Sequence, residues 1–266
     1  WAGIVPALER GRAACNGEFI ARLDADDIAI EGRIEAQLAA LRDNTSLAAV
    51  GGKAQLFSEL DETNKGMSIY VDWVNKQLDP FPQRLVESPL FHPAVTMRAS
   101  TIEKVGGYSN GDFPEDYDLW LRLIEAGFLI ENIDRDVVKI RDHIGRLTRT
   151  DSRYRKAGFT QVKLRHMSNF IAPKPRRIAI MGAGKGARPW IRWARDAGHE
   201  ISLIMDIKPG GFRGTTPVVA VEELAHTEFD LLIVTVGARG VRDQLRAQIY
   251  DLRPDLIEGE GWFAVA

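Results

Sequence analysis

Apolar and polar positions alternate between helical and extended spacing over the first 150 residues. Ile4, Ala7, Leu8 and Gly11 recur at intervals of three and four, which is typical of one buried helix face, and the apolar run ending at Leu23 predicts a strand. Further helices are expected at residues 34–41, 72–78, 100–105 and 115–124, and further strands at 47–52, 92–98, 128–132 and 136–141. This alternation predicts an α/β fold.

The same kind of pattern restarts after a proline-rich stretch at residues 172–175. A strand at 177–181, a glycine-rich turn at 182–186 and a helix at 187–197 are followed by strands that end at Asp206 and near residue 236. This order is typical of a parallel nucleotide-binding sheet. We therefore expect one domain at 1–150 and a second at 176–266, joined by a basic helix (153–170) and a linker within 151–175.

Composition places the chain among globular proteins. It has 266 residues, 45% apolar and 27% charged, with a formal net charge of −2. No apolar run approaches the roughly 18–20 residues that span a bilayer. The single cysteine, Cys15, excludes a disulfide framework and favours a reducing, cytoplasmic setting. No secretory signal pattern opens the sequence, which starts at Trp1 inside a predicted helix, so we expect a portion of the protein to precede it.

Three carboxylates follow the strand that ends at Leu23. Asp24, Asp26 and Asp27 stand at the mouth of a buried strand, where like charges repel and are costly to desolvate. A hard cation such as Mg²⁺ or Mn²⁺, shared with substrate phosphates, relieves that cost. Asp-x-Asp also occurs at positions 116/118 and 134/136, but only the first copy ends a strand, so it is the candidate metal and phosphate site.

Two further motifs could carry chemistry. The pair Gly106-Gly107 permits close backbone approach or positive φ. Glu115 and Asp116 open a predicted helix, where carboxylates are also stabilised by the helix macrodipole, so a capping role and a catalytic role both stay open.

The ordered motifs DADD (24–27), HPAVTMR (92–98), VGGY (105–108) and PEDYDLWLRL (114–123) closely resemble family 2 glycosyltransferases with the GT-A fold. The resemblance covers roughly residues 3–149. It implies a partial GT-A doubly wound sheet, a nucleotide-sugar donor, Mg²⁺ or Mn²⁺, inversion at the anomeric carbon, and a saccharide or lipid-linked acceptor. We expect no nucleic-acid partner.

The resemblance also assigns roles to residues. Asp24 and Asp26 correspond to the motif for the metal and the nucleotide phosphates, and His143 to a further metal ligand, although a lone histidine can equally be structural. Asp116 corresponds to the general base, with Glu115 beside it for acceptor contacts, and Gly106 and Gly107 to a loop near the donor sugar. Arg146 and Arg149, just beyond His143, are our candidates for neutralising the leaving diphosphate.

Two departures from the family pattern bear on activity. Relatives begin with a strand–helix–strand unit that builds much of the nucleotide pocket and that does not precede Trp1 here. Glu9 occupies a position where relatives often carry asparagine. The chain is therefore expected to be an N-terminally truncated family member that can be inactive.

Residues 141–177 form a basic stretch, with eleven Lys and Arg against only Asp142 and Asp151. A solvated connector is one interpretation. The other is that its first part faces anionic phosphates and its last part an acidic surface. Peripheral contact with an anionic membrane also stays open.

Residues 176–266 resemble, more loosely, the small Rossmann-like domain attached to some of these transferases and to certain sugar-nucleotide acyltransferases. Gly182, Gly184 and Gly186 depart from GxGxxG spacing because the third glycine comes one residue early. The following helix N-terminus could still hold a phosphate, and Asp206 stands where a ribose-binding acid would. Packing alone is the alternative explanation for this turn.

Three functions follow. The first is an inverting, metal-dependent sugar transferase of polysaccharide or glycoconjugate assembly. The second is a catalytically impaired chain that acts as a nucleotide-binding or interaction module through its C-terminal domain. The third, an oxidoreductase built on residues 176–266, is disfavoured because no proton donor is apparent.

Overall fold

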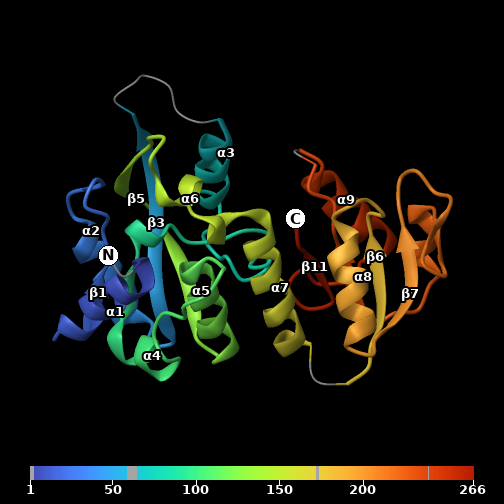
Figure 1. The fold of residues 1–266 in the computed structure, drawn as a ribbon, viewed down its shortest axis with the longest axis horizontal. Coiled ribbons are helices and arrows are strands. Elements are labelled where there is room, and N and C mark those ends of the chain that lie inside the picture. Colours follow the sequence, from blue (N-terminus) through green and yellow to red (C-terminus); the bar gives the residue numbers. More distant parts are fainter. Residues whose placement is uncertain (1–2, 59–64, 172–173, 239) are drawn as a thin grey trace. The chain divides into compact units, whose positions relative to one another are not determined.

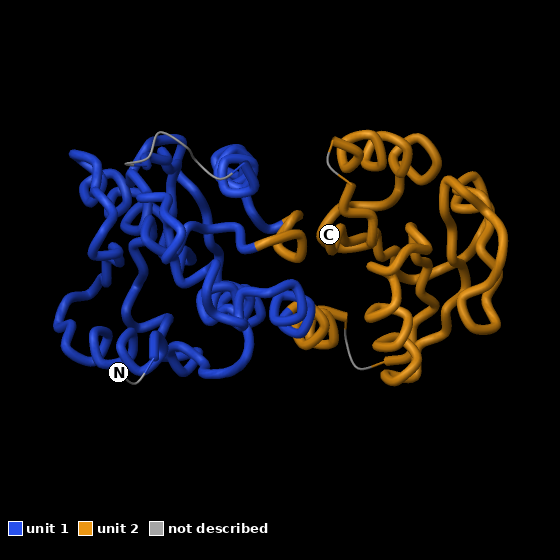
Figure 2. The backbone as a smooth tube through the Cα atoms, turned by 45° about the horizontal axis from the view of Figure 1, so that its top comes forward, with its two compact units in different colours: residues 1–81, 88–162 blue, residues 82–87, 163–266 orange. Residues whose placement is uncertain are grey.

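The computed structural model describes residues 3–58, 65–171, 174–238 and 240–266. These residues form two compact units, residues 1–81 with 88–162 and residues 82–87 with 163–266 (Figure 2). Residues 59–64, and residues 172–173 of the expected linker, lie outside the described ranges. Within the described part of the chain, no helix is long and apolar enough to cross a membrane.

The first unit is built on a five-stranded sheet with the order β1-β4-β3-β5-β2, in which only β3 and β5 pair in parallel (Figure 1). It is therefore an α/β unit with a mixed sheet. Its elements in chain order are α1 (Ile4–Ala14), β1 (Phe19–Ala21), β2 (Ile28–Ala29), α2 (Arg33–Asp43), β3 (Leu47–Phe57), α3 (Lys65–Val74), η1 (His92–Ala94), β4 (Thr96–Arg98), α4 (Ala99–Lys104), α5 (Glu115–Glu125), β5 (Leu129–Arg141), α6 (Leu147–Thr150), η2 (Ser152–Tyr154) and the first half of α7 (Lys156–Phe170).

Three expected elements differ from the structure. The strands expected at 128–132 and 136–141 are one strand, β5, because a register shift against β3 accommodates the polar residues 134–135. The expected strand 92–98 begins as a single 3₁₀ turn, since Pro93 has no N–H for a sheet ladder. The helix expected at 72–78 lies at 65–74, where its apolar face packs on Val137 and Val138.

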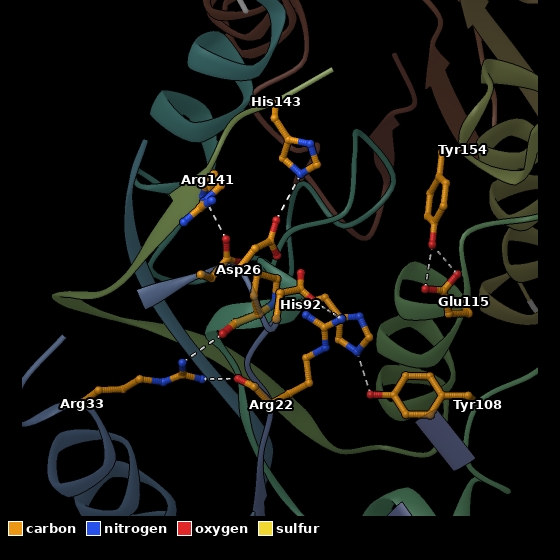
Figure 3. Close-up of polar contacts among 12 residues, drawn as sticks. Arg22, Asp26, Arg33, His92, Tyr108, Glu115, Arg141, His143 and Tyr154 are labelled. Atoms are coloured by element: carbon orange, nitrogen blue, oxygen red, sulfur yellow. Dashed lines mark hydrogen bonds and ion pairs between the residues drawn. The ribbon is translucent and has the colours of Figure 1, made fainter. Parts of the chain in front are cut away.

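A buried polar contact fixes the end of β1. Arg33, on α2, is only 2% exposed, and its guanidinium donates to the carbonyl oxygens of Arg22 at 2.7 Å and Pro93 at 2.9 Å. Burial lowers the pKa of Arg33 to about 10. Because an unpaired buried cation would be costly, these bonds hold the segment after β1 against the η1 turn (Figure 3).

The second unit contains a six-stranded sheet with the order β11-β10-β6-β7-β9-β8, parallel except between β8 and β9. Chain order runs from β6 to β7 on one side and later to β10 on the other, so the carboxyl end of β6 is a topological switch point. Its elements are the rest of α7, β6 (Arg177–Met181), α8 (Ala187–Asp196), β7 (Glu200–Met205), β8 (Phe212–Arg213), β9 (Thr216–Val219), η3 (Val221–Ala225), β10 (Leu231–Val234), α9 (Arg242–Leu252) and β11 (Trp262–Ala264). The α/β class expected from the sequence is thus confirmed.

Residues 82–87 belong to this second unit although residues of the first unit precede and follow them in the sequence (Figure 2). Arg84 is 3% exposed, donates to the Gly259 carbonyl oxygen at 2.8 Å, and lies over the rings of Phe170 and Phe263. The buried Lys163 ammonium donates to the carbonyl oxygens of Val86 and Val265. The hexapeptide is therefore an integral part of the second core.

Candidate active site

The acidic loop after β1 brings two distant parts of the chain together. His143 Nε2 lies 3.1 Å from Asp26 Oδ2, although 117 positions separate the two residues (Figure 3). The side chains of Asp26 and His143 are 44% and 42% exposed. Asp24, 37% exposed, is ion-paired with Arg22 at 2.5 Å. Asp24, Asp26 and His143, singled out from the sequence, thus belong to one neighbourhood that solvent can reach.

Several polar atoms around this loop are left unsatisfied. Arg22 Nη1, Arg146 Nη1 and Asp27 Oδ2 are buried and have no hydrogen-bond partner among the described residues. Asp27 Oδ1 accepts the Arg141 N–H at 2.8 Å, and burial raises the pKa of Asp27. Buried unpaired donors are costly, so the two arginine nitrogens indicate a place where an anionic group is expected to bind.

The same observations test whether a divalent cation fits. Among the described residues, no group of three or more His, Cys, Asp or Glu side chains is gathered closely enough to hold a metal by itself. Asp26 and His143 form a pair, and Asp24 lies two residues away in the sequence. Carboxylate and imidazole are suitable ligands for Mn²⁺, and Mg²⁺ usually completes its shell with waters and substrate phosphates. The residues therefore fit a cation that arrives with a diphosphate.

The two arginines predicted to neutralise phosphate differ in the structure. Arg149 Nη2 donates to Asp142 Oδ1 at 2.5 Å, and Asp142 is 4% exposed. Arg149 therefore compensates a buried carboxylate. Arg146, with its unpartnered Nη1, keeps capacity for a ligand.

The glycine pair is a tightly held loop. Gly106 and Gly107 have φ values of 83° and 69°, which only glycine adopts readily. Glu9 Oε1 accepts the Tyr108 N–H at 2.8 Å and would lie 2.5 Å from a Cβ at position 107. Glu9 thus fastens the loop to α1, which gives a structural role to the residue that departs from the family pattern.

A second clamp comes from α5. Arg122 donates to the carbonyl oxygens of Val105 and Gly107 at 2.6 and 2.7 Å, and its Nε pairs with the fully buried Asp118. These contacts explain why Asp and Arg stand four residues apart in the DLWLR part of the motif: together they connect the helix to the backbone of the glycine loop.

A pocket of about 640 Å³ lies beside the acidic loop. Its volume is within the range of small-molecule sites. Apolar residues of α1 and β1 are among its lining residues, and Arg12, Arg22, Asp24 and Tyr108 supply polar groups. Tyr108 also contacts His92 Nε2 at 2.7 Å through its hydroxyl, and burial holds the pKa of His92 well below its usual value (Figure 3).

The Glu115–Asp116 pair opens α5, as expected, and its two members have different surroundings. Glu115 is 1% exposed, and the Tyr154 hydroxyl donates to its two carboxylate oxygens at 2.8 and 2.9 Å (Figure 3). Asp116 is half-buried. Burial and then the negative charge of Glu115 raise the pKa of Asp116 to about 7. A carboxylate with that pKa suits proton abstraction near neutral pH.

Sequence reasoning missed Arg22, Tyr154 and the polar role of Tyr108. Arg22 could have been found, because side chains alternate along a strand and it stands two positions before Asp24. Tyr108 follows the glycine pair directly. Tyr154 carries no local signal, since its partner Glu115 lies 39 positions away.

In the second unit, the structure brings the four residues of the possible nucleotide site together. Gly182 follows β6, and Asp206 Oδ2 accepts the Ala183 N–H at 2.7 Å. Asp206 Oδ1 accepts the Lys208 N–H at 3.0 Å, and the Arg213 Nε donates to the Ala183 carbonyl oxygen. Gly184 and Gly186 complete the turn that leads into α8. Nucleotide binding there remains a prediction.

Comparison with known proteins gives the family context. The family model Glycosyl transferase family 2 matches residues 1–105. The chain is 27% identical over 139 residues to the amylovoran biosynthesis glycosyltransferase AmsE of Erwinia amylovora, covering 52% of this chain and 50% of that protein. It is 32% identical over 139 residues to the UDP-Gal:alpha-D-GlcNAc-diphosphoundecaprenol beta-1,3-galactosyltransferase of Escherichia coli, covering 52% and 49%.

The chain thus spans about half the length of the curated relatives it matches. Among solved structures, the mannosyltransferase PcManGT from Pyrobaculum calidifontis, in complex with GDP-Man and Mn²⁺, is 12% identical with a TM-score of 0.39, covering 64% of this chain and 43% of that chain. The chain carries a glycosyl transferase family 2 domain, which the family model matches at residues 1–105.

Proposed function

We propose that the protein transfers a sugar from a nucleotide-sugar donor to a hydroxyl of a saccharide or lipid-linked acceptor, with inversion, in the assembly of a polysaccharide or glycoconjugate. The observation that carries the proposal is the approach of Asp26 and His143 beside buried, unpartnered Arg22 and Arg146 nitrogens. Carboxylate, imidazole and guanidinium in one place suit a diphosphate with its cation. The named functions of the matched relatives agree with this reaction class.

In this proposal, Asp24, Asp26 and His143 would hold Mg²⁺ or Mn²⁺. When bound, the cation would neutralise charge on the leaving diphosphate as a Lewis acid. Arg22 and Arg146 would donate to phosphate oxygens with the guanidinium N–H groups that the described residues leave unsatisfied. Gly106 and Gly107, held by Glu9 and Arg122, would let backbone approach the donor sugar.

Asp116 would accept the proton of the attacking acceptor hydroxyl. Its pKa near 7 makes the ionised form abundant just above neutral pH and keeps it basic enough to take a proton. Glu115 is buried against Tyr154, so its proposed part is electrostatic, in place of the direct acceptor contact expected from the resemblance.

The test is donor hydrolysis with Mn²⁺, supplying UDP-sugars and GDP-sugars in parallel. Asp26→Asn keeps the size of the side chain and removes its charge, and we expect a loss of about 100-fold. Asp136→Asn is the matched control, because Asp136 belongs to another Asp-x-Asp and its carboxylate accepts a hydrogen bond from the exposed Gln55 side chain. Unchanged turnover in Asp26→Asn would refute the metal assignment.

A second candidate function is nucleotide binding by the C-terminal unit in a catalytically impaired chain. The observation that favours it is the glycine turn at the switch point between β6 and β10, with Asp206 at the end of β7. Quenching of tryptophan fluorescence by UDP, and separately by NAD(H), tests it, because Trp190 and Trp193 lie on α8. Absence of a response at millimolar nucleotide would dismiss this candidate.

A further inference from the structure

The buried carboxylate Glu115 is held by a turn that lies far along the chain. Tyr154, the last residue of η2, donates its hydroxyl to Glu115 Oε1 at 2.8 Å and Oε2 at 2.9 Å (Figure 3). Arg153 Nη1 lies 3.7 Å from Glu115 Oε2. Since Glu115 is 1% exposed, these two side chains replace the water that an exposed carboxylate would have.

The turn itself is fixed by Asp151. Its carboxylate accepts the Arg153 N–H at 2.9 Å and pairs with the Arg153 Nε at 3.2 Å. Burial raises the pKa of Tyr154 further above its usual value, so the hydroxyl keeps its proton, and its capacity to donate, at any pH an enzyme works at. The turn is therefore a permanent hydrogen-bond donor for Glu115.

Glu115 in turn faces Asp116. The charged and titratable groups around the pair are Arg22 from the segment after β1, Tyr108 from the glycine loop, and Arg153 and Tyr154 from η2. Burial raises the pKa of Glu115 above its usual value, and a backbone hydrogen bond, the Tyr154 hydrogen bond and the Arg153 charge limit that rise. Two of these three stabilising contacts to the ionised form come from η2.

We propose that Tyr154, supported by Arg153, is a positioning residue that keeps Glu115 as a buried anion beside Asp116 and thereby makes Asp116 basic enough to deprotonate an acceptor hydroxyl. The catalytic consequence rests on the proposed function; the electrostatic arrangement does not.

The proposal links the two ends of the candidate site. His143 and Arg146 come just before α6, and Tyr154 ends η2 only a few residues later. One short segment thus supplies contacts to the acidic loop at its start and to Glu115, beside Asp116, at its end. A change in this segment is expected to affect both donor binding and proton abstraction.

The experiment is a ¹³C-carboxyl NMR titration of the full chain between pH 4 and pH 9. In Tyr154→Phe, the titration midpoint of Glu115 should rise. The midpoint of Asp116 should then fall by about 0.5–1 pH unit, because Glu115 stays protonated, and therefore uncharged, to a higher pH. Glu115→Gln retains an oxygen acceptor for Tyr154 but removes the charge, so it should lower the Asp116 midpoint at least as much. Tyr250→Phe, at an exposed tyrosine, is the control and should leave both midpoints unchanged.

An Asp116 midpoint that stays in place in Tyr154→Phe, while the unfolding temperature falls, would overturn the proposal and leave Tyr154 a packing residue. Should Tyr154→Phe not fold, Arg153→Met gives both midpoints and Glu115→Gln gives the Asp116 midpoint. The pH profile of donor hydrolysis adds the catalytic test: its acid limb should move with the NMR midpoint. Midpoints that move as expected in a chain without any donor hydrolysis would count against the proposed function alone.

Discussion

The loop after β1 and the turn after β6 both follow the carboxyl end of a strand, yet their polar groups are satisfied differently. Around the first loop, Arg22 Nη1, Arg146 Nη1 and Asp27 Oδ2 are buried without a partner among the described residues. In the second, both oxygens of Asp206 accept backbone N–H groups, and Arg213 donates to a backbone carbonyl oxygen.

The difference teaches that a motif at a strand end does not by itself indicate a ligand. Buried polar groups need partners, so a cluster that the protein leaves incomplete is where an external group gains most by binding. A cluster that is complete contributes to folding instead. We therefore expect substitutions in the first loop to change binding, and those in the glycine turn to change stability.

The largest effect is expected in the glycine turn. Gly182 has a φ of 97°, and a Cβ there would lie 2.6 Å from Val236 Cγ2. Gly182→Ala should lower the free energy of unfolding by about 3 kcal/mol, through backbone strain and overpacking. Gly184→Ala is the control, because nothing lies within 4 Å of its Cβ position, and should change stability by less than about 0.5 kcal/mol. Urea unfolding measures both; equal losses would contradict this account of the turn.

Next in size is the loss of a phosphate donor. Arg22→Met should weaken binding of UDP or GDP with Mn²⁺ by about 2 kcal/mol, roughly 30-fold, because a charged donor is removed. The melting temperature should change little, since the substitution also removes the buried Arg22 Nη1, which has no partner among the described residues. Calorimetric titration and thermal unfolding give the two readings. Unchanged diphosphate binding in Arg22→Met would contradict the conclusion that the loop after β1 is the binding site.

Arg213→Met is the mirror experiment. It should leave diphosphate binding unchanged and lower stability by about 1 kcal/mol, because the Ala183 carbonyl oxygen loses its donor.

A smaller difference in stability is expected between substitutions of Asp206 and Asp24. Asp206→Ala should cost about 1–2 kcal/mol of stability, since the Ala183 and Lys208 N–H groups lose their acceptor. Asp24→Ala should cost less than about 0.5 kcal/mol, because the Asp24 side chain is 37% exposed and its carboxylate is accessible to water without Arg22. Comparable losses in chemical denaturation would show that both sites contribute to folding alike.

The smallest effect concerns pH. The pKa of Asp116 is raised to about 7, so the stability that its protonated form contributes at acid pH is lost as pH rises through 7. Asp116→Asn avoids that loss, and its melting temperature relative to the unsubstituted chain should increase between pH 5 and pH 8. We expect a gain of about 1 kcal/mol or less, since Asp116 is half-buried. A difference independent of pH would contradict the raised pKa.

The sequence predicted those parts of the fold that depend on residues close together in the chain. Strand ends, helix starts and glycine turns have characteristic local residue patterns. These patterns predicted the acidic loop, the start of α5 and the order β6, glycine turn, α8. The single strand β5 could not, because its continuity depends on a register shift against β3.

The candidate site divides in the same way. Asp24, Asp26 and Asp116 were predictable from their motifs, and His143 from the resemblance. The Tyr154–Glu115 contact was not, because nothing near either residue reports a partner 39 positions away. Nor was the engagement of Arg149 with Asp142, since adjacent charges look alike in a sequence whether they serve a ligand or a buried carboxylate.

Residues 82–87 carry a consequence for how such proteins recombine. Because the hexapeptide packs in the second core, the polypeptide passes between the two units at three places: after Phe81, after Glu87 and after Val162. A chimera made by exchanging only the sequence after Val162 would deprive Arg84 and Leu85 of the core they are buried in. Exchange of this C-terminal unit among transferases should therefore succeed only when residues 82–87 are taken from the same protein as the unit.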